Sequence, residues 1–143
     1  MWNIGGSIVK IKLDKDAFVP ERAFPNDAGL DLFTPISFWL YSGEHKSVDT
    51  GVHVEIPDGY VGLITSKSGL MLKGITSRGT IDSGYRGSIR AVLYNSGNEA
   101  VKFERGQKLT QLVIVPCLLE DVEIVDDLTD TDRGDGGFGS TGI

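Results

Sequence analysis

The segment Gly79–Gly87, which reads Gly-Thr-Ile-Asp-Ser-Gly-Tyr-Arg-Gly, contains the residues with the clearest potential for chemistry. It places one carboxylate, Asp82, three residues before one aromatic ring, Tyr85. A carboxylate beside an electrophilic centre can orient a water molecule and accept its proton. The glycines at 79, 84 and 87 permit positive φ angles and let a ligand approach the main chain. Because apolar runs flank the segment, we expect a β-hairpin that forms part of a pocket for a planar ligand. Asp-Ser-Gly is also an ordinary turn sequence, so a plain turn is the alternative.

A second polar segment, Ser66-Lys67-Ser68-Gly69, is suited to binding an anion. A lysine between two small hydroxyl residues and before a glycine can aim an ammonium group and N–H groups at one point. The residues that follow, Leu70–Lys73, are the only stretch that reads as a short helix, so Ser68 is equally a candidate for its N-cap. The two roles are compatible because they use the same exposed N–H groups.

Two polar residues stand inside apolar strand patterns. Asp31 lies between Leu30 and Leu32, so its side chain points away from the apolar face and is expected to be solvated. Gln111 lies inside Leu109–Val115, a run that predicts a strand buried on both faces. A buried amide must be hydrogen-bonded, either within the protein or to a ligand.

The last part of the chain differs from the rest in composition. Acidic residues accumulate from Glu120 onward, and the segment 133–142 has many glycines and too little apolar surface to order itself. It nevertheless carries a guanidinium group, Arg133, and an aromatic ring, Phe138, which are suited to binding a phosphate and stacking on a base. We expect a flexible C-terminal arm.

The composition predicts an all-β protein. The chain has 143 residues, of which 40% are hydrophobic, and this length corresponds to one domain with a substantial core. Turn signals recur about every eight to twelve residues and no long helical periodicity is present, so we expect an antiparallel meander. Val52–Ile56 and Tyr60–Thr65 are predicted to pair across Pro57-Asp58-Gly59, whereas Gly43–Asp49 reads as a turn. The other predicted strands are Ile8–Leu13, Leu30–Leu32, Phe38–Tyr41, Ile89–Tyr94 and Leu109–Val115.

Several classes of function are disfavoured. A net charge of −6 argues against direct nucleic-acid binding, which needs a broad basic face. The apolar run Leu112–Val115 is too short to span a bilayer and no leader pattern stands at the N-terminus, so no membrane association and a cytoplasmic location are expected. Cys117 is the only cysteine, and we expect it to be buried rather than reactive. His45 and His53 have no partner cysteines, which disfavours a transition-metal site.

Taken together and in order, these segments resemble the five motifs of the trimeric dUTPase family, over nearly the whole chain from Ala28 to Gly142. The family hydrolyses dUTP to dUMP and pyrophosphate. The most specific motifs are Gly79–Gly87 and Gly-Gly-Phe-Gly-Ser-Thr-Gly at 136–142. The others are Ala-Gly-Leu-Asp-Leu at 28–32, Ser-Gly-Leu at 68–70 and Gly-Gln-Lys-Leu-Thr-Gln-Leu at 106–112.

The resemblance implies roles for the first segment. Asp82 would activate the water that attacks the α-phosphorus. Tyr85 would pack under the deoxyribose and leave no room for a 2′-hydroxyl. The backbone of Gly79, Thr80 and Ile81 would read the edge of uracil, where the methyl group of thymine and the donor pattern of cytosine fit badly.

The resemblance also implies how the triphosphate is held. Lys67, Ser68 and Gly69 would bind the phosphates, with Lys108 and Gln111 nearby. Asp31 would help to place Mg²⁺ through coordinated water, which suits a cation that keeps part of its hydration shell. From the arm, Arg133 would reach the γ-phosphate and Phe138 would cover the uracil, with Gly139 and Ser140 also in contact with substrate, so the arm would close as a lid.

The implied fold is a single dUTPase-like (β-clip) domain, a jelly-roll-like β-barrel over about residues 1–125 with one short helix, followed by the flexible lid arm over about 126–143. It would assemble as a homotrimer in which each active site takes residues from all three chains. The implied biological role is to limit uracil incorporation into DNA and to supply dUMP for dTMP synthesis. Nothing in the residue spacing itself indicates the trimer.

The chain departs from the family pattern at three positions. Lys67 and Lys108 stand where arginine is frequent, which keeps the charge but loses bidentate geometry and predicts a weaker grip on the triphosphate. Thr76 stands where some relatives have an asparagine near uracil, so no role is assigned to it.

Three other functions remain as alternatives. A dCTP deaminase of the same fold would carry a glutamate as proton shuttle where this chain has Val92, which cannot transfer a proton. A regulatory protein that uses nucleotide as a switch for a protein partner, as some phage members are thought to do, is compatible with the arm and with catalysis. A catalytically silent jelly-roll protein would neither hydrolyse dUTP nor order its arm on nucleotide.

Overall fold

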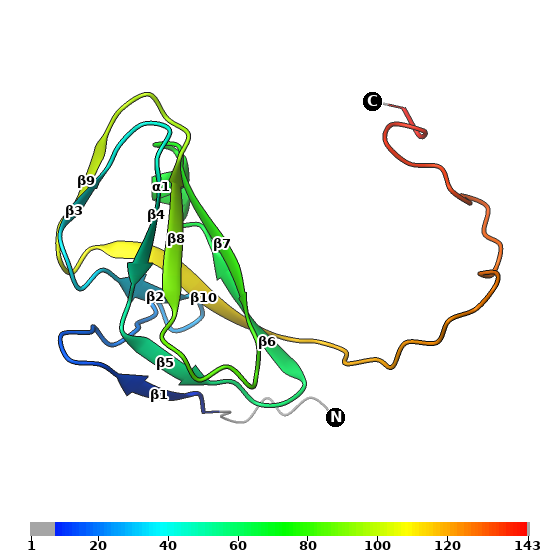
Figure 1. Ribbon diagram of the computed structural model, residues 1–143, viewed down its shortest axis with the longest axis horizontal. Helices are drawn as coiled ribbons and strands as arrows, with labels where there is room; N and C mark the ends of the chain where they lie inside the picture. The colour runs from blue at the N-terminus through cyan, green and yellow to red at the C-terminus, as the bar shows by residue number, and fades with distance from the viewer. Residues whose placement is uncertain (1–7, 143) are drawn as a thin grey trace.

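The computed structural model describes residues 8–142, so the ends of the predicted domain, 1–7 and 143, lie outside the described residues. Within 8–142 the chain forms strands and one four-residue helix, which confirms the predicted all-β class (Figure 1). In chain order the elements are β1 (Lys10–Leu13), β2 (Leu30–Phe33), β3 (Phe38–Leu40), β4 (His45–Asp49), β5 (Val52–Glu55), β6 (Tyr60–Thr65), α1 (Ser68–Met71), β7 (Ile75–Ile81), β8 (Arg90–Asn95), β9 (Val101–Phe103) and β10 (Lys108–Pro116).

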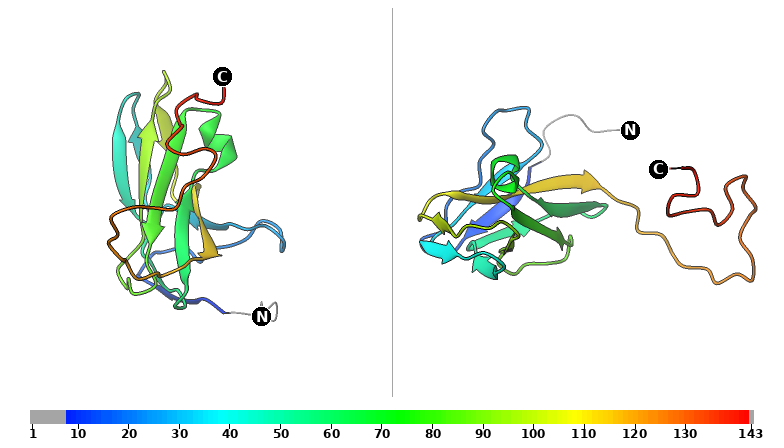
Figure 2. Two further views of the ribbon diagram at one scale, coloured as in Figure 1. Left: turned by 90° about the vertical axis from the view of Figure 1, so that its right-hand side faces the viewer. Right: turned by 90° about the horizontal axis from the view of Figure 1, so that it is seen from above.

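The strands form one large sheet and two small ones, all with antiparallel pairing. The large sheet has the order β2-β10-β6-β7-β8-β4, and β1-β5 and β3-β9 form two-stranded sheets beside it. Strand β7 links the two halves of the large sheet, because Ile75–Ser77 pairs with β8 whereas the part from Arg78 to Ile81 pairs with β6. The sheet curls around this strand (Figure 2).

Two apolar clusters fill the interior. One joins Leu32, Val54 and Leu112 with neighbouring side chains of β2, β5, β6 and β10. The other is built around Leu93 and Phe103 on β8 and β9. In β8, as the alternating pattern predicts, inward side chains are fully buried while the outward ones reach solvent. Each fully buried Leu or Ile stabilises the fold by about 1.5–3 kcal/mol.

The predicted pairing of β5 with β6 is wrong. The turn itself is present, since the N–H of Tyr60 donates to the carbonyl of Pro57 at 3.2 Å. However, β5 pairs with β1, and β6 pairs with β10 and β7. A Cβ at position 62 would lie 2.7 Å from Ile56 and 2.8 Å from Leu112, so Gly62 lets β6 pack closely across the interior from β5. The turn therefore connects two sheets rather than two neighbours in one sheet.

Two further expectations about elements are corrected. The segment predicted as a polar turn contains strand β4, in which His45, Ser47 and Asp49 are exposed while Val48 points inward and is 2% exposed. Ser68 is the first residue of α1 and not its N-cap; the cap position is Lys67, which makes no side-chain capping hydrogen bond. Leu70 of the helix is half-buried and packs against the cluster around Leu93 and Phe103, which docks α1 on the β-structure.

After β10 ends at Pro116, residues 117–142 contain no helix or strand and run away from the β-structure (Figures 1 and 2). Nearly all of their side chains are exposed. Cys117, at the start of this segment, is half-buried and free of a disulfide. Among the described residues, no helix has the length and apolar character needed to cross a membrane.

Candidate active site

Asp31 is the centre of a compact charge cluster. It lies on β2 and is only 2% exposed, so the expectation that it is solvated is wrong. Lys67 Nζ donates to Asp31 Oδ1 at 2.5 Å, and Lys108 Nζ lies 3.1 Å from Oδ2. Burial by itself raises the pKa of Asp31, but the hydrogen bonds and charges of the two lysines outweigh it and hold that pKa below its ordinary value. The carboxylate is thus ionised and fixes two cations at one end of the sheet.

Gln111 lies next to Asp31 across the β2–β10 ladder, and Thr65 follows across β10–β6. The Gln111 amide donates to the carbonyl of Ser66 at 3.1 Å, so the half-buried side chain is satisfied within the protein. A Cβ at position 29 would overlap the Gln111 carboxamide, which explains why a glycine precedes β2 here. These contacts tie the start of the Lys67 loop to the two strands that carry Asp31 and Lys108.

A network of largely buried hydroxyl groups anchors the Lys67 loop to β7 and β10. The sequence patterns do not predict this network. Ser66 Oγ donates to the carbonyl of Ser77 at 2.9 Å and accepts from its N–H at 2.8 Å. The hydroxyls of Ser77 and Thr110 lie 2.6 Å apart, and Thr110 donates to the carbonyl of Thr65 at 2.9 Å. Small hydroxyl residues at buried strand positions were the only available signal. A cavity of ≈ 450 Å³ opens beside the network and is lined by Ser66, Ser77, Thr76, Arg78, Tyr94 and Ser96.

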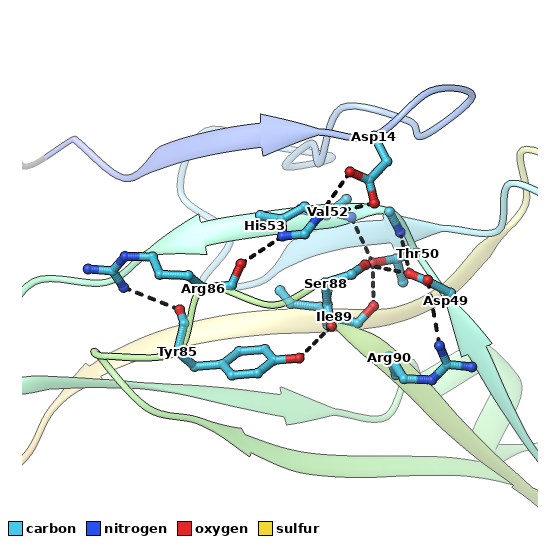
Figure 3. Close-up of polar contacts among 11 residues, drawn as sticks. Asp14, Asp49, Thr50, Val52, His53, Tyr85, Arg86, Ser88, Ile89 and Arg90 are labelled. Atoms are coloured by element: carbon cyan, nitrogen blue, oxygen red, sulfur yellow. Dashed lines mark hydrogen bonds and ion pairs between the residues drawn. The ribbon is translucent and has the colours of Figure 1, made fainter.

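The Asp82–Gly87 turn presents its two functional side chains at the surface. Tyr85 N–H donates to the Asp82 carbonyl at 3.1 Å, which closes the turn, and Asp82 is exposed. The Tyr85 ring is 43% exposed, and its hydroxyl donates to the carbonyl of Ser88 at 2.9 Å (Figure 3). A Cβ at position 87 would overlap this ring, so Gly87 makes room for it. The ring is therefore fixed with one side open.

The expected role of the glycines is corrected. Gly79, Gly84 and Gly87 do not adopt positive φ angles; they serve close approach instead, as at Gly87, or leave open space, as at Gly84. The predicted hairpin is present as the β7–β8 connection, but only Ile75–Ser77 pairs with β8. The connection is thus a broad loop rather than a tight turn.

That loop leaves one backbone edge of β7 without a strand partner. Gly79, Thr80 and Ile81 pair with Ile64, Leu63 and Gly62 of β6 on one side. Among the described residues no strand pairs with their other side. Alternate N–H and C=O groups on that side are available to a planar ligand beside Tyr85.

Within one chain the two parts of the candidate site lie apart. Thr65 and Arg78 mark the end of the β6–β7 ladder next to the Asp31 cluster, whereas Gly62 and Ile81 mark the other end, next to the Asp82 turn. At 3.2–3.4 Å per residue the two ends are separated by about 10 Å along the strands. The structure therefore brings Asp31, Lys67, Lys108 and Gln111 together, and Gly79–Ile81, Asp82 and Tyr85 together, but not the first group with the second.

The residues predicted in the arm form a third, separate group. Phe138 is fully exposed, with φ at 50°, and Arg133 Nε donates to the carbonyl of Gly136 at 2.7 Å within the arm itself. Gly139 and Ser140 are also exposed. The segment that carries them, near the C-terminal end of the ribbon, runs apart from the β-structure of its own chain (Figure 1).

The carboxylate of Asp31 could contact Mg²⁺ only through water. No group of three or more His, Cys, Asp or Glu able to hold a metal occurs among residues 8–142. Both oxygens of Asp31 are already engaged by lysines. A lone, lysine-bound carboxylate fits a hydrated Mg²⁺ carried by a polyphosphate and contacted through water, and it does not fit a protein-built metal cage.

Comparisons with known proteins agree with one another. The family model described as dUTPase matches residues 15–142. The deoxyuridine 5′-triphosphate nucleotidohydrolase of Cutibacterium acnes is 46% identical over 130 residues, which cover 87% of this chain and 86% of the relative. The enzyme of the same name from Clostridium acetobutylicum is 43% identical over 136 residues, covering 92% and 94% of the two chains.

Solved structures give the same result. The dUTPase of Staphylococcus bacteriophage 80alpha with dUPNHPP superposes with a TM-score of 0.91 at 31% identity, covering 96% of this chain and 100% of that one. A mutant dUTPase of phage phi11 of S. aureus, described with a coordinated structural Mg(II) ion, has a TM-score of 0.79 at 29% identity and covers 85% and 98%.

Proposed function

The chain belongs to the dUTPase family, and on that premise we propose how this dUTP diphosphatase hydrolyses dUTP to dUMP and pyrophosphate. Its fold is the all-β, jelly-roll-like fold of the family. Asp82 accepts a proton from the water that attacks the α-phosphorus. The observation that carries the proposal is the surface turn that holds the Asp82 carboxylate and the Tyr85 ring next to Gly79–Ile81, whose outer backbone edge pairs with no strand of residues 8–142.

Selectivity for deoxyuridine follows from this turn. The Tyr85 ring is fixed by Gly87 and Ser88, so a sugar packed on its open side has no room for a 2′-hydroxyl. Backbone donors and acceptors along Gly79–Ile81 match the edge of uracil, and the exocyclic amine of cytosine reverses one of those pairings. The methyl group of thymine adds volume to the base where the backbone of β7 approaches it most closely, so thymine fits badly.

The triphosphate is bound by the charge cluster around Asp31. Lys67 and Lys108 present their ammonium groups at fixed positions because Asp31 holds both, and Ser68 and Gly69 offer main-chain N–H groups at the start of α1. When bound, Mg²⁺ supplies charge that stabilises the pyrophosphate leaving group. Asp31 would help to hold the ion through its coordinated water. Gln111 supports the loop through Ser66 and lies close enough to assist.

The separation of the three residue groups supports a homotrimer with shared active sites. A site that needs both Asp82 and Lys67 is incomplete in one chain, and the exposed arm with Arg133 and Phe138 ends away from its own β-structure. A closed ring of three copies can bring one turn, one phosphate cluster and one arm together. In each site Arg133 binds the γ-phosphate and Phe138, with Gly139 and Ser140, covers the uracil as a lid.

The reaction has two consequences that we also propose as the biological role, in the cytoplasm. Removal of dUTP limits uracil incorporation into DNA, and its product dUMP feeds dTMP synthesis.

The decisive test is pyrophosphate release from dUTP, dCTP, dTTP and UTP measured side by side, with Mg²⁺ and with a chelator. We expect dUTP to be preferred over each competitor by a factor of about 10³ or more in kcat/KM, because the cytosine edge of dCTP mispairs with the backbone and neither the methyl group of dTTP nor the 2′-hydroxyl of UTP has room. Activity should fall on chelation and return with added Mg²⁺. Equal rates with all four nucleotides, or ammonia release from dCTP, would contradict the proposal.

Subunit complementation tests the shared site. Lys67→Ala is expected to raise KM for dUTP because it removes one phosphate contact, and Asp82→Asn to remove turnover. Mixing the two variants and allowing subunit exchange should restore activity at sub-KM dUTP to roughly a quarter of the parent value, since sites then form with Asp82 from one chain and Lys67 from another. Each variant incubated alone is the control. No recovery in mixtures shown to exchange subunits would place both residues of a site in one chain.

A further inference from the structure

Residues of the β4–β5 region fasten the turn that carries Tyr85 to the β-structure, and His53 among them contacts Arg86, the residue after Tyr85. Just after the turn, the N–H of Ile89 donates to the carbonyl of Val52 at 2.8 Å. The N–H and the hydroxyl of buried Thr50 both donate to the carbonyl of Ile89. Ser88 donates to Asp49 (Figure 3). These contacts fix the chain after the turn and leave residues 82–87 to other supports.

His53 bonds at both ring nitrogens. Its Nδ1 lies 2.7 Å from the carbonyl oxygen of Arg86, the residue next to Tyr85. Its Nε2 lies 3.0 Å from both carboxylate oxygens of Asp14, just beyond β1 (Figure 3). The ring therefore bridges the catalytic turn and the end of the first described strand.

The geometry selects the protonated ring. A carbonyl oxygen only accepts hydrogen bonds, and so does an ionised carboxylate. Both ring nitrogens must then donate, which only the imidazolium form can do. Neutral His53 keeps one of these two bonds and sets a nitrogen lone pair against the other acceptor.

We propose that His53 is a positioning residue for the Tyr85 turn: its imidazolium fastens Arg86 to Asp14 and so holds the deoxyribose platform in its binding position. The inference rests on the proposed function, in which Tyr85 packs under the sugar. His53 acts through the turn and touches no reacting atom.

The surrounding charges decide how the ring titrates. The hydrogen bond to the Arg86 carbonyl, followed by the bond and charge of Asp14, raises the pKa of His53, and burial and Lys12 oppose this. The His53 side chain is 21% exposed at a surface groove lined by residues of β1 and β5 and by Arg86, so protons can exchange there. The charged groups that face it are Lys10, Lys12 and Asp14 on or after β1, Glu55 on β5, Asp49 on β4 and Arg86 on the turn.

Because the pKa is raised in the folded protein, the bridge is complete below about pH 6.5, the ordinary value for histidine, and one bond is lost as pH rises through the higher, folded pKa. Above that value the turn is held less firmly.

The test compares the parent with His53→Gln, whose side-chain amide can donate to one acceptor as neutral histidine does. At about pH 6 the variant should show a KM for dUTP that is about three- to ten-fold higher, with kcat changed by less than about two-fold, because one charge-assisted hydrogen bond is lost. At about pH 9 the ratio of the two KM values should approach one, since both proteins then have one donor. Amide hydrogen exchange of residues 83–88 should show the same pattern in the variant-to-parent ratio, which cancels the intrinsic pH effect on exchange.

The chain offers matched controls. His45, the only other histidine, stacks on Tyr94 at the opposite end of β4 from Asp49 and Arg90. His45→Gln should leave both ratios at one, and in that background the remaining imidazole signal in an NMR titration belongs to His53. Asp14→Asn keeps an acceptor but removes the charge, so it should lower the His53 midpoint toward about 6.5 without loosening the turn at low pH.

A variant-to-parent ratio that is the same at both pH values, whether near one or well above it, overturns the proposal. So does an unchanged KM when exchange in the turn has increased. Hydrogen exchange and the NMR titration need no turnover, so they test the bridge even if dUTP is not hydrolysed. Hydrolysis of dUTP with flat ratios contradicts the bridge and leaves the proposed function intact.

Discussion

Asp82→Asn is expected to lower kcat for dUTP by about 10²–10⁴-fold, the contribution of a positioned general base. Asparagine has the shape of aspartate but cannot accept the proton of the attacking water. The Asp82 side chain is exposed and makes no side-chain hydrogen bond among the described contacts, so the fold should be unchanged. Single-turnover kinetics should show the loss in the chemical step, while the affinity for a non-hydrolysable dUTP analogue changes by less than about three-fold.

The matched control is Asp58→Asn, which alters another exposed carboxylate in a surface turn, between β5 and β6. We expect parent activity from it. If Asp82→Asn hydrolyses dUTP at the parent rate, Asp82 is not the group that activates water.

A chain that ends at Asp132, and so lacks Arg133, Phe138 and the residues between and after them, is expected to lose about 10²–10³-fold in kcat/KM. Base stacking contributes about 1–3 kcal/mol and a charge-assisted hydrogen bond to phosphate a similar amount. The removed side chains are exposed in the free protein, so thermal unfolding should be nearly unaffected. Steady-state kinetics and a thermal melt on the same sample measure the two effects.

Point variants separate the two contributions. Phe138→Ala and Arg133→Ala should each lower kcat/KM by part of the loss that the truncation causes. The control Asp130→Asn, in the same arm, should change kcat/KM by less than about three-fold. Full activity of the truncated chain would show that the arm does not close over the substrate.

Strands could be predicted where one face is apolar and regular. In β8 and β5 the apolar residues alternate, and Ala91, Leu93, Val52 and Val54 are buried as their pattern predicts. Strand β4 was missed because its inward face contributes one apolar side chain, Val48, among polar neighbours. Its strand conformation comes from pairing with β8, a contact that the local sequence does not encode.

The partner of a strand was harder to predict than its existence. Pro57-Asp58-Gly59 correctly indicates a reversal, but a reversal does not determine which strand lies alongside. Close packing at Gly62 and the pairing of β5 with β1 place the two strands in different sheets.

In the candidate site, too, the local sequence does not encode contacts between distant parts of the chain. The motif around Asp82 and Tyr85 predicts a β-hairpin, and the structure contains it as a broad surface loop between β7 and β8. The pattern of β2 places the Asp31 side chain in solvent, whereas the structure buries it. Its carboxylate charge is balanced by Lys67 and Lys108, which come from distant parts of the chain and so leave no local signal. Local periodicity assigns a side chain to a face of its strand, and only the assembled sheet determines what covers that face.

The most direct measurement is a crystal structure of the protein with a non-hydrolysable dUTP analogue and Mg²⁺. The account predicts deoxyribose on the Tyr85 ring, uracil hydrogen-bonded to the backbone of Gly79–Ile81, and a water between Asp82 and the α-phosphorus. It also predicts the phosphates on Lys67 and Ser68 of a different copy of the chain. A base bound away from the Tyr85 turn would contradict the account.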